Sequence, residues 1–354
     1  MTRRRHDRPV PEEHMKSIHH ALLAATALLT LASAARATEN GATHVDLGYF
    51  GILGGFGTPP GEPFLSLDVN QVVSSRFNDR NGNPIKVNLG ALGQYPVKFL
   101  GNTTAEIING AYTFPTLVPF LNAHVGVAAY AVFAAARAEA QDAIFGRVSG
   151  SGETIGGVGD TTVIPFFLQW DLPTAYTHVL LSPVEFTAPT GQYNRNDPIG
   201  ANVGLNYFSY RPAIVTTYLN PQGLELDLNV NGSFNGTNSA THYQSGDEFS
   251  TTFSAIQHFS PRYGVGFQGY YYKQFTGDKL NGVEVNTVRP VSAFTPFDPT
   301  NQGPGNKGQV FAIGPAFTYN YTPTVGANFR FQHEVFSDNR RQGEVLWGKI
   351  FAAF

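Results

Sequence analysis

The chain has 354 residues, with 23 Lys and Arg against 26 Asp and Glu and a formal net charge of −3. This balance lacks the basic excess that nucleic-acid binding requires, so no nucleic-acid partner is expected. Only 14% of the residues are charged, while 13% are aromatic, 38 are glycine and none is cysteine. The lack of cysteine excludes disulfides and thiolate sites, and the remaining composition is typical of a bacterial outer-membrane β-barrel.

The first 37 residues have the layout of an export signal. Lys16 follows the second methionine, Met15, the apolar run 21–31 comes next, and Ala35-Arg36-Ala37 forms an A-x-A cleavage site. The run is too short for a membrane-spanning helix, which needs about 17–25 apolar residues. We therefore predict a signal peptide over 1–37, with Met15 as the expected start of translation and Thr38 as the first residue of the exported chain.

Residues 38–61 form an N-terminal strap without a strand pattern. The segment is rich in glycine and carries Tyr49, Phe50 and Phe56, but it alternates poorly. An apolar segment without a strand partner is costly to leave in water, so we predict that the strap lies inside the barrel near its periplasmic mouth and plugs it. A disordered leader is the alternative.

Alternation of apolar and polar residues begins at residue 62, and we predict a transmembrane β-barrel over 62–354. Because bacterial single-chain barrels have an even number of strands, we expect about 12, with 10–14 possible and with one segment between 86 and 120 forming a loop. The Ala-rich run 125–140 could be a helix, but its β-branched residues favour a strand. The candidate strands cover 62–73, 86–99, 108–120, 123–136, 160–171, 177–188, 203–218, 222–234, 246–259, 263–275, 308–321, 324–338 and 343–354.

The alternation also predicts which side chains face lipid. Between 224 and 231, four aliphatic residues interleave with two acids and two amides, and a one-residue slip would expose both acids to lipid. A soluble β-sandwich could alternate in the same way and remains the alternative. Polar stretches at 137–159, 189–201 and 276–307 are predicted to be loops.

The same parity turns a set of polar and aromatic side chains toward the lumen. We expect them to line a solute path or to set its charge selectivity; alternatively the tyrosines belong to an interfacial girdle and the charged residues pair to fill a narrow barrel. The set comprises Glu225, Asp227, Gln268, Tyr270, Tyr272, Arg330 and Glu334.

The C-terminus carries an assembly signal. Every second residue before the terminal Phe354 is apolar or glycine, which gives a stripe that ends in an aromatic residue. The stripe consists of Leu346, Gly348, Ile350, Ala352 and Phe354. This stripe resembles the signal by which the barrel assembly machinery recognises its substrates, although the third residue from the end is often aromatic in that signal.

The chain resembles the outer-membrane proteins described as the MetA pathway of phenol degradation, also called the SphA family. The resemblance covers roughly 41–354 and rests on the order and spacing of several short fragments. It implies a passive outer-membrane channel for small hydrophobic, aromatic compounds, with membrane lipid and the solute as partners and no established catalytic residue. The fragments are Gly57-Thr58-Pro59-Pro60-Gly61, Gly157-Val158-Gly159-Asp160, Ala188-Pro189-Thr190-Gly191, Arg211-Pro212-Ala213, Thr241-His242-Tyr243-Gln244-Ser245-Gly246 and Gly269-Tyr270-Tyr271-Tyr272.

Other function classes have weaker support in the sequence. A barrel-borne lipid or peptide hydrolase needs a histidine beside a nucleophile, and the best cluster is His242 near Ser245, Asp247 and Glu248. No Ser has Gly at both positions two away, so the nucleophile elbow is missing. We expect no enzyme activity, no cofactor and no metal site; a structural or adhesion barrel is a further alternative.

Overall fold

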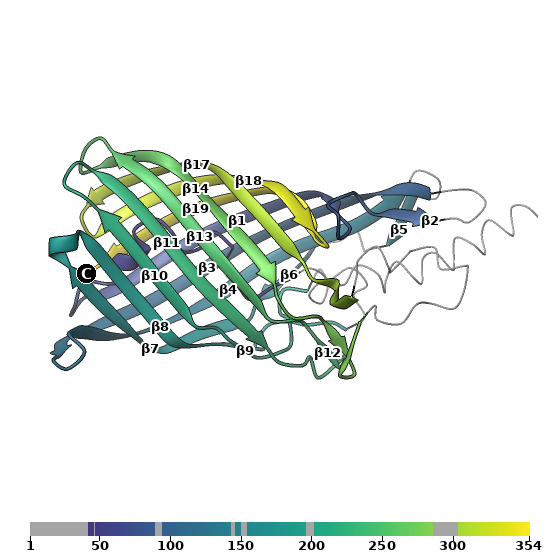
Figure 1. Ribbon diagram of the computed structural model, residues 1–354, viewed down its shortest axis with the longest axis horizontal. Helices are drawn as coiled ribbons and strands as arrows, with labels where there is room; N and C mark the ends of the chain where they lie inside the picture. Colours follow the sequence, from purple (N-terminus) through teal and green to yellow (C-terminus); the bar gives the residue numbers. More distant parts are fainter. Residues whose placement is uncertain are drawn as a thin grey trace, which may run out of the picture.

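The computed structural model describes residues 42–45, 47–88, 94–142, 146–149, 154–195, 202–285 and 304–354. Within these ranges, 12 antiparallel strands close into a barrel (Figure 1). The predicted signal peptide over 1–37 lies outside the described residues. No helix in the described ranges is long and apolar enough to cross a membrane. The barrel strands are β1(Pro63–Phe77), β3(Gln94–Val118), β4(Ala123–Asp142), β7(Thr161–Leu172), β8(Thr177–Ala188), β10(Ala213–Leu219), β11(Leu224–Asn235), β13(Glu248–His258), β14(Tyr263–Gln274), β17(Gln309–Thr322), β18(Val325–Asp338) and β19(Arg341–Ala353).

Each barrel strand pairs with its neighbours in the chain, and the first strand pairs with the last. In the closing pair, Phe64 of β1 lies opposite Ala353 of β19, and the register continues to Phe77 opposite Arg341. Closure leaves no free sheet edge, which a lipid environment requires because it cannot satisfy unpaired backbone groups. Shorter strands extend the sheet or form a small second sheet: β2(Lys86–Asn88), β5(Gly146–Ser149), β6(Ile155–Val158), β9(Ser209–Tyr210), β12(Tyr243–Gln244), β15(Lys279–Leu280) and β16(Val283–Glu284).

The two ends of the barrel differ in the length of their connections. Short turns at 119–122, 173–176, 220–223, 259–262 and 323–324 gather at one end, together with the C-terminus (Figure 1). At the other end the β18–β19 turn at 339–340 is also short, but the remaining connections are longer and carry the short extra strands. Outer-membrane barrels have short periplasmic turns and long extracellular loops, so the end with the C-terminus is the periplasmic end.

The strands alternate as the sequence indicates. In β11, Leu226 and Leu228 are exposed on the outside of the barrel at 43% and 44%, whereas Glu225, Asp227 and Asn229 are buried in the lumen. In β18, Phe329 and Phe331 face outward and Arg330 is buried. The apolar outer band and the polar lumen are those of a membrane barrel, so the soluble β-sandwich is excluded.

Several predicted boundaries are wrong. The segments 86–99 and 108–120 belong largely to one long strand, β3, so no loop separates them. The barrel has 12 strands because these two candidate strands are one strand, and not because one of them is a loop. The predicted loop 137–159 contains the end of β4 together with β5 and β6. The predicted strand 203–218 begins only at Ser209 and is interrupted, because Pro212, which cannot donate a backbone hydrogen bond, separates β9 from β10.

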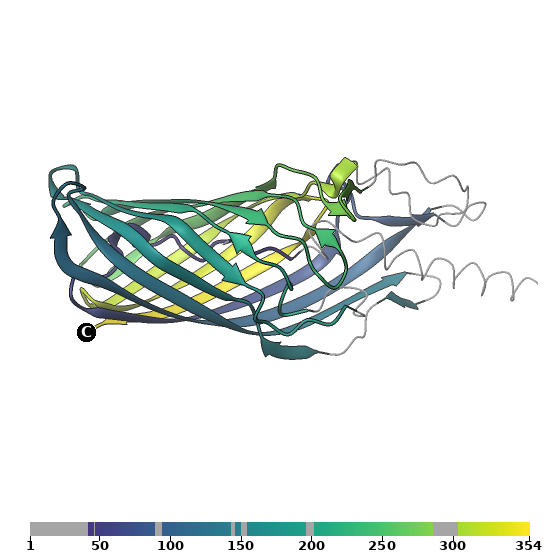
Figure 2. The same cartoon turned by 90° about the horizontal axis from the view of Figure 1, so that it is seen from below.

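The strap runs inside the barrel, where Figure 2 shows it in purple behind the strands. Residues 43–45 lie near the outer ends of the strands: the Thr43 hydroxyl donates to Glu248 Oε2 at 2.5 Å, at the first residue of β13. The strap then descends through η1(Gly54–Phe56) toward β1. It therefore reaches much further up the lumen than the predicted position at the periplasmic mouth.

Candidate functional site

One wall of the lumen binds the carbonyl groups of the strap. Arg330 of β18 is 1% exposed and donates from Nη1 to the carbonyl oxygens of Gly48 at 2.8 Å and Tyr49 at 3.0 Å. Its guanidinium also lies 5.1 Å from the ring centroid of Trp347 of β19. A buried cation needs acceptors to offset its desolvation, and here the strap backbone supplies them.

The opposite wall binds the amide groups of the strap. The backbone N–H of Leu53 donates to Glu225 Oε1 at 2.8 Å, and that of Gly55 donates to Thr217 Oγ1 at 2.9 Å. Glu225 also meets His258 Nε2 at 2.5 Å. The strap thus turns the carbonyls of Gly48 and Tyr49 toward one wall and the N–H groups of Leu53 and Gly55 toward the other, and these side-chain partners replace part of the strand pairing that the strap lacks.

The remaining predicted lumen residues form hydrogen bonds within the barrel wall. Asp227 accepts from Thr217 and Ser254, each at 2.5 Å. Tyr270 donates to Glu334 Oε1 at 2.8 Å, Tyr272 donates to Glu248 Oε1 at 2.7 Å, and Gln268 Oε1 accepts from Gln332 at 3.1 Å. Arg330 and Glu334 do not pair with each other: the carboxylate nearest to Arg330 is Asp68, 3.8 Å from Nη2.

Tyr270 and Tyr272 lie in an aromatic core that fills the middle of the lumen. This cluster also contains Tyr49 of the strap and Trp347, whose ring centroids are 5.8 Å apart. Both tyrosine hydroxyls are committed to carboxylates, and neither tyrosine lines the cavity described next. The strap residue and the wall residues are therefore packed as one core at this level of the barrel.

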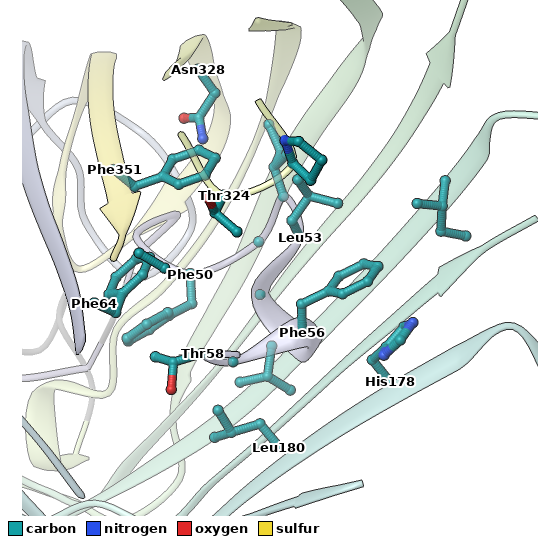
Figure 3. A pocket seen from close by; sticks show the side chains of 18 of the residues that line it. Phe50, Leu53, Phe56, Thr58, Phe64, His178, Leu180, Thr324, Asn328 and Phe351 are labelled. Carbon is teal, nitrogen blue, oxygen red and sulfur yellow. The ribbon is translucent and has the colours of Figure 1, made fainter. Parts of the chain in front are cut away.

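A cavity of about 1050 Å³ lies between the strap and the barrel wall and extends to the turns of the periplasmic end. Figure 3 shows the strap residues Phe50 and Phe56 and the strand residues Phe64 and Phe351 around it. Its volume exceeds that of a single-ring aromatic molecule severalfold, and its lining is largely apolar, as in small-molecule sites. The apolar lining comprises Phe50, Leu53, Phe56, Phe64, Leu180, Val215, Tyr321 and Phe351.

Polar groups enter the cavity from two sides. The Phe56 ring is stacked on His178 of β8 with centroids 3.8 Å apart, and His178 Nδ1 lies 2.6 Å from Asp171 Oδ1. On the other side, Asn328, Arg330 and Lys349 line the cavity from β18 and β19. These few polar groups can orient a bound molecule within the apolar space.

Four of the predicted site residues line the cavity: Tyr49, Phe50, Phe56 and Arg330. The other six do not line it: Glu225, Asp227, Gln268, Tyr270, Tyr272 and Glu334. Asn328, Lys349 and His178 also line the cavity and were not among the site residues predicted from the sequence. Lys349 could have been found, since it alternates with the outward stripe of Leu346, Gly348 and Ile350. His178 gave no such signal, because its role depends on the strap reaching it.

The outer end of the strap is held by a histidine. His44 Nδ1 lies 2.7 Å from Ser209 Oγ, and its Nε2 lies 3.0 Å from Asp160 Oδ2. Ser209 is 1% exposed and donates to Asn235 Oδ1 at 2.7 Å. Burial lowers the pKa of His44, and the contact with the Asp160 carboxylate opposes this shift. Although Ser, His and Asp meet here, the hydroxyl is enclosed and already donates, so the trio anchors the strap.

The predicted hydrolase cluster is not assembled. His242 has a positive φ of 56°, and its backbone takes part in a turn through N–H to the Asn238 carbonyl at 2.8 Å. No hydrogen bond of the described residues joins the His242 ring to Ser245, Asp247 or Glu248. Nor do the described ranges contain a group of three or more His, Asp or Glu placed to hold a metal ion.

The closed barrel, its apolar outer band and its polar lumen define an integral protein of the bacterial outer membrane. Residues 74–350 match the family model described as the MetA-pathway of phenol degradation. The chain belongs to this family. A search of the curated proteins gave no significant match.

Solved structures share the fold. An outer membrane channel from Pseudomonas putida F1 is 13% identical, with a TM-score of 0.60 over 88% of this chain and 100% of that one. The β domain of the Bordetella autotransporter BrkA is 7% identical, with a TM-score of 0.42 over 84% of this chain and 100% of that one. The CymD monoaromatic hydrocarbon channel is 10% identical, with a TM-score of 0.38 over 84% and 89% of the two chains. The first likeness supports the fold, and the other two are too distant to add to it.

Proposed function

We propose that this protein is a passive outer-membrane channel for small hydrophobic, aromatic compounds. The observation that carries the proposal is the apolar cavity at the periplasmic side of the strap, lined by Phe50, Phe56, Phe64 and Phe351. Four phenylalanines offer ring faces and edges on which an aromatic solute packs favourably. The family description, which refers to phenol degradation, agrees with such a solute.

The strap serves as the gate of this channel. Tyr49 packs among Tyr130 and Trp347 and closes the lumen above the cavity. The strap is held at separate points by Glu248, Arg330, Glu225 and Thr217 and, through His44, by Ser209 and Asp160. No strand pairs with its described residues. A solute can therefore pass when these few contacts open, without any break in the barrel wall. In this proposal residues 1–37 are the export signal and 38–61 the plug.

Uptake by whole cells tests the proposal. Cells that degrade toluene or phenol, with and without this gene, are supplied with limiting solute, and the initial rate of uptake is measured. We expect faster uptake with the protein and no difference at saturating solute, where diffusion through the membrane suffices. Equal rates at limiting solute would contradict the channel.

A deletion of residues 40–57 that keeps the signal peptide tests the gate separately. If the strap closes the lumen, cells with this deletion admit bulky antibiotics that the intact protein excludes. Unchanged antibiotic sensitivity, with normal amounts of folded barrel, would mean that the strap does not close the lumen. A purified protein that hydrolyses acyl esters or peptides would instead support the enzyme alternative, and a lumen that stays closed to every solute would favour an adhesion or structural barrel.

A further inference from the structure

A row of polar side chains crosses three strands at the level of the cavity. Lys349 of β19 lies opposite Asp68 of β1 in one pair and opposite Asn328 of β18 in the other. All three side chains face the lumen. Directly opposed residues have Cβ atoms about 4.5–5.5 Å apart, so the three groups form one continuous polar strip.

The strip carries more positive than negative charge. Asp68 lies 3.7 Å from Lys349 Nζ and 3.8 Å from Arg330 Nη2, so two cations share one carboxylate at distances longer than a hydrogen bond. Arg330 uses Nη1 for the strap, while its buried Nε and Nη2 have no hydrogen-bond partner among the described residues. A buried guanidinium with unused donors is a site for an anion.

The cation, and not the acid, is reached from the cavity. The side chain of Lys349 is 14% exposed and that of Asp68 is 0% exposed. Asn328, Arg330 and Lys349 line the same cavity as Phe50 and Phe351. Figure 3 shows Asn328 next to Phe351 at the edge of this space. A molecule in the cavity therefore meets an apolar surface and, at the strip, the ammonium of Lys349. The two acids that also line the cavity, Asp171 and Glu185, are paired with His178 and Arg211.

We propose that the cavity selects aromatic monocarboxylates, with the ring among the phenylalanines and the carboxylate at Lys349, Asn328 and Arg330. A carboxylate that accepts from an ammonium and a guanidinium forms charge-assisted hydrogen bonds, which are about twice as strong as neutral ones. It also neutralises the charge that Asp68 leaves uncompensated. A neutral hydrocarbon fills the apolar part but leaves the cations facing it. This inference names the solute class for the proposed channel and rests on that function.

Calorimetric titration of the purified, detergent-solubilised protein with benzoate and benzamide tests the selection. The two compounds have nearly the same shape, and at pH 7.5 only benzoate is charged. We expect benzoate to bind about tenfold more tightly than benzamide. Equal affinities, or tighter binding of benzamide, would overturn the proposal.

Three variants assign the effect to the strip. Lys349→Gln should bring the affinity ratio of benzoate to benzamide close to one while the affinity for benzamide is kept. Asp68→Asn removes the competing carboxylate and should raise the ratio, and it keeps the proposal testable if Lys349→Gln does not fold. Lys279→Gln, an exposed lysine at the opposite end of the barrel, is the matched control and should leave the ratio unchanged.

The titration distinguishes a failure of the carboxylate selection from a failure of the proposed channel function. If benzamide binds as well as benzoate, the cavity still accepts aromatic solutes and only the carboxylate selection is wrong. If neither compound binds to a protein whose folded state is shown by heat-modifiable migration in gels, the cavity is not a solute site and both proposals are wrong. A ratio that survives Lys349→Gln would show that the selection does not come from the strip.

Discussion

At the scale of single residues, the side of a strand on which a side chain lies decides how much folding free energy is lost when that side chain is substituted. In β11, Leu224 is half-buried at the periplasmic end of the strand, whereas Leu228 is exposed near its middle. Both face outward, and the two acids between them, Glu225 and Asp227, face the lumen. The strand therefore offers two lipid-facing leucines that differ in depth and not in side.

We expect Leu228→Arg to reduce the free energy of folding into bilayers by about 2–4 kcal/mol, because the guanidinium meets hydrocarbon near the midplane. Leu224→Arg, close to the interface, should cost only about 0–1 kcal/mol. Urea titration of folding into phospholipid vesicles measures both variants. If Leu224→Arg were the more costly change, the assigned depth would be wrong; if neither had a cost, the assigned side would be wrong.

The carboxyl of Asp278 connects two outer loops and gives them a pH dependence. It accepts from the Gly246 N–H at 2.7 Å, from Gln274 Nε2 at 2.6 Å and from the Tyr243 hydroxyl. Burial outweighs these donors and raises the pKa of Asp278 to about 7. The carboxyl therefore keeps its proton in the closed loops at pH values where it would lose it in water.

Protonation accordingly favours the closed loops. Their closing free energy should be most favourable below about pH 4, weaken as the pH rises from about 4 to about 7, and stay constant above that. Hydrogen exchange of the Gly246 amide, corrected for its intrinsic pH dependence, measures this change. Because burial also raises the pKa of the neighbouring Glu248 to about 7, Asp278→Asn should reduce the dependence and not abolish it. A wild-type protection that is flat from pH 4 to 7 would refute the assignment.

At the scale of elements, the strap depends on one close approach to the barrel wall. A Cβ on Gly55 would lie 2.4 Å from the Thr217 backbone nitrogen and 2.6 Å from the His178 carbonyl oxygen, and neither atom can move without disturbing the sheet. A Cβ on Gly54 would meet Val215 Cγ1 at 2.8 Å, and this methyl group can rotate away. The two neighbouring glycines thus form a matched pair.

We expect Gly55→Ala to push η1 off the wall, break the Gly55 N–H bond to Thr217 and raise single-channel conductance in planar bilayers severalfold. Gly54→Ala should leave conductance near that of the wild type. Equal conductance in all three proteins would show that the strap does not limit passage. Normal yields of both variants would show that the barrel itself is unaffected.

The sequence allowed the barrel elements to be predicted where a two-sided environment imposes alternation. Lipid favours the apolar Leu228 and the lumen favours the charged Asp227. The even or odd position in the strand is therefore enough to predict which side of the barrel wall each side chain faces. The same reasoning fails in β3, where residues 100–107 alternate too weakly to join the predicted strands 86–99 and 108–120. There the strand is sustained by pairing with both β1 and β4, which a local pattern does not contain.

The candidate site was predictable only in part for a related reason. Arg330 and the strap aromatics follow from parity and composition. The cavity instead arises where the strap leaves the wall, and it joins residues from β1, β8, β18 and β19 that no local spacing connects. His178 is an example, since only the arrival of Phe56 places it in the site.

At the scale of the whole molecule, the barrel is complete only when its last strand pairs with its first. The Phe354 N–H donates to the Pro63 carbonyl at 3.0 Å, and the Phe354 ring is 66% exposed at the periplasmic end. The ring thus adds little to the packing of the folded protein. This exposure fits the proposal that the assembly machinery reads the terminal aromatic residue before the barrel closes.

We expect Phe354→Ala to lower the amount of folded protein in the outer membrane severalfold, while the purified variant refolds in detergent as well as the wild type. An exposed ring contributes little burial energy, so a loss that occurs only in cells must arise from recognition. Phe259→Ala, which removes an aromatic ring that is 74% exposed in a turn of the same end, is the control and should assemble normally. The readout is heat-modifiable protein in isolated outer membranes; equal losses for the two variants, or impaired refolding of Phe354→Ala in detergent, would show that Phe354 acts through stability and not as a signal.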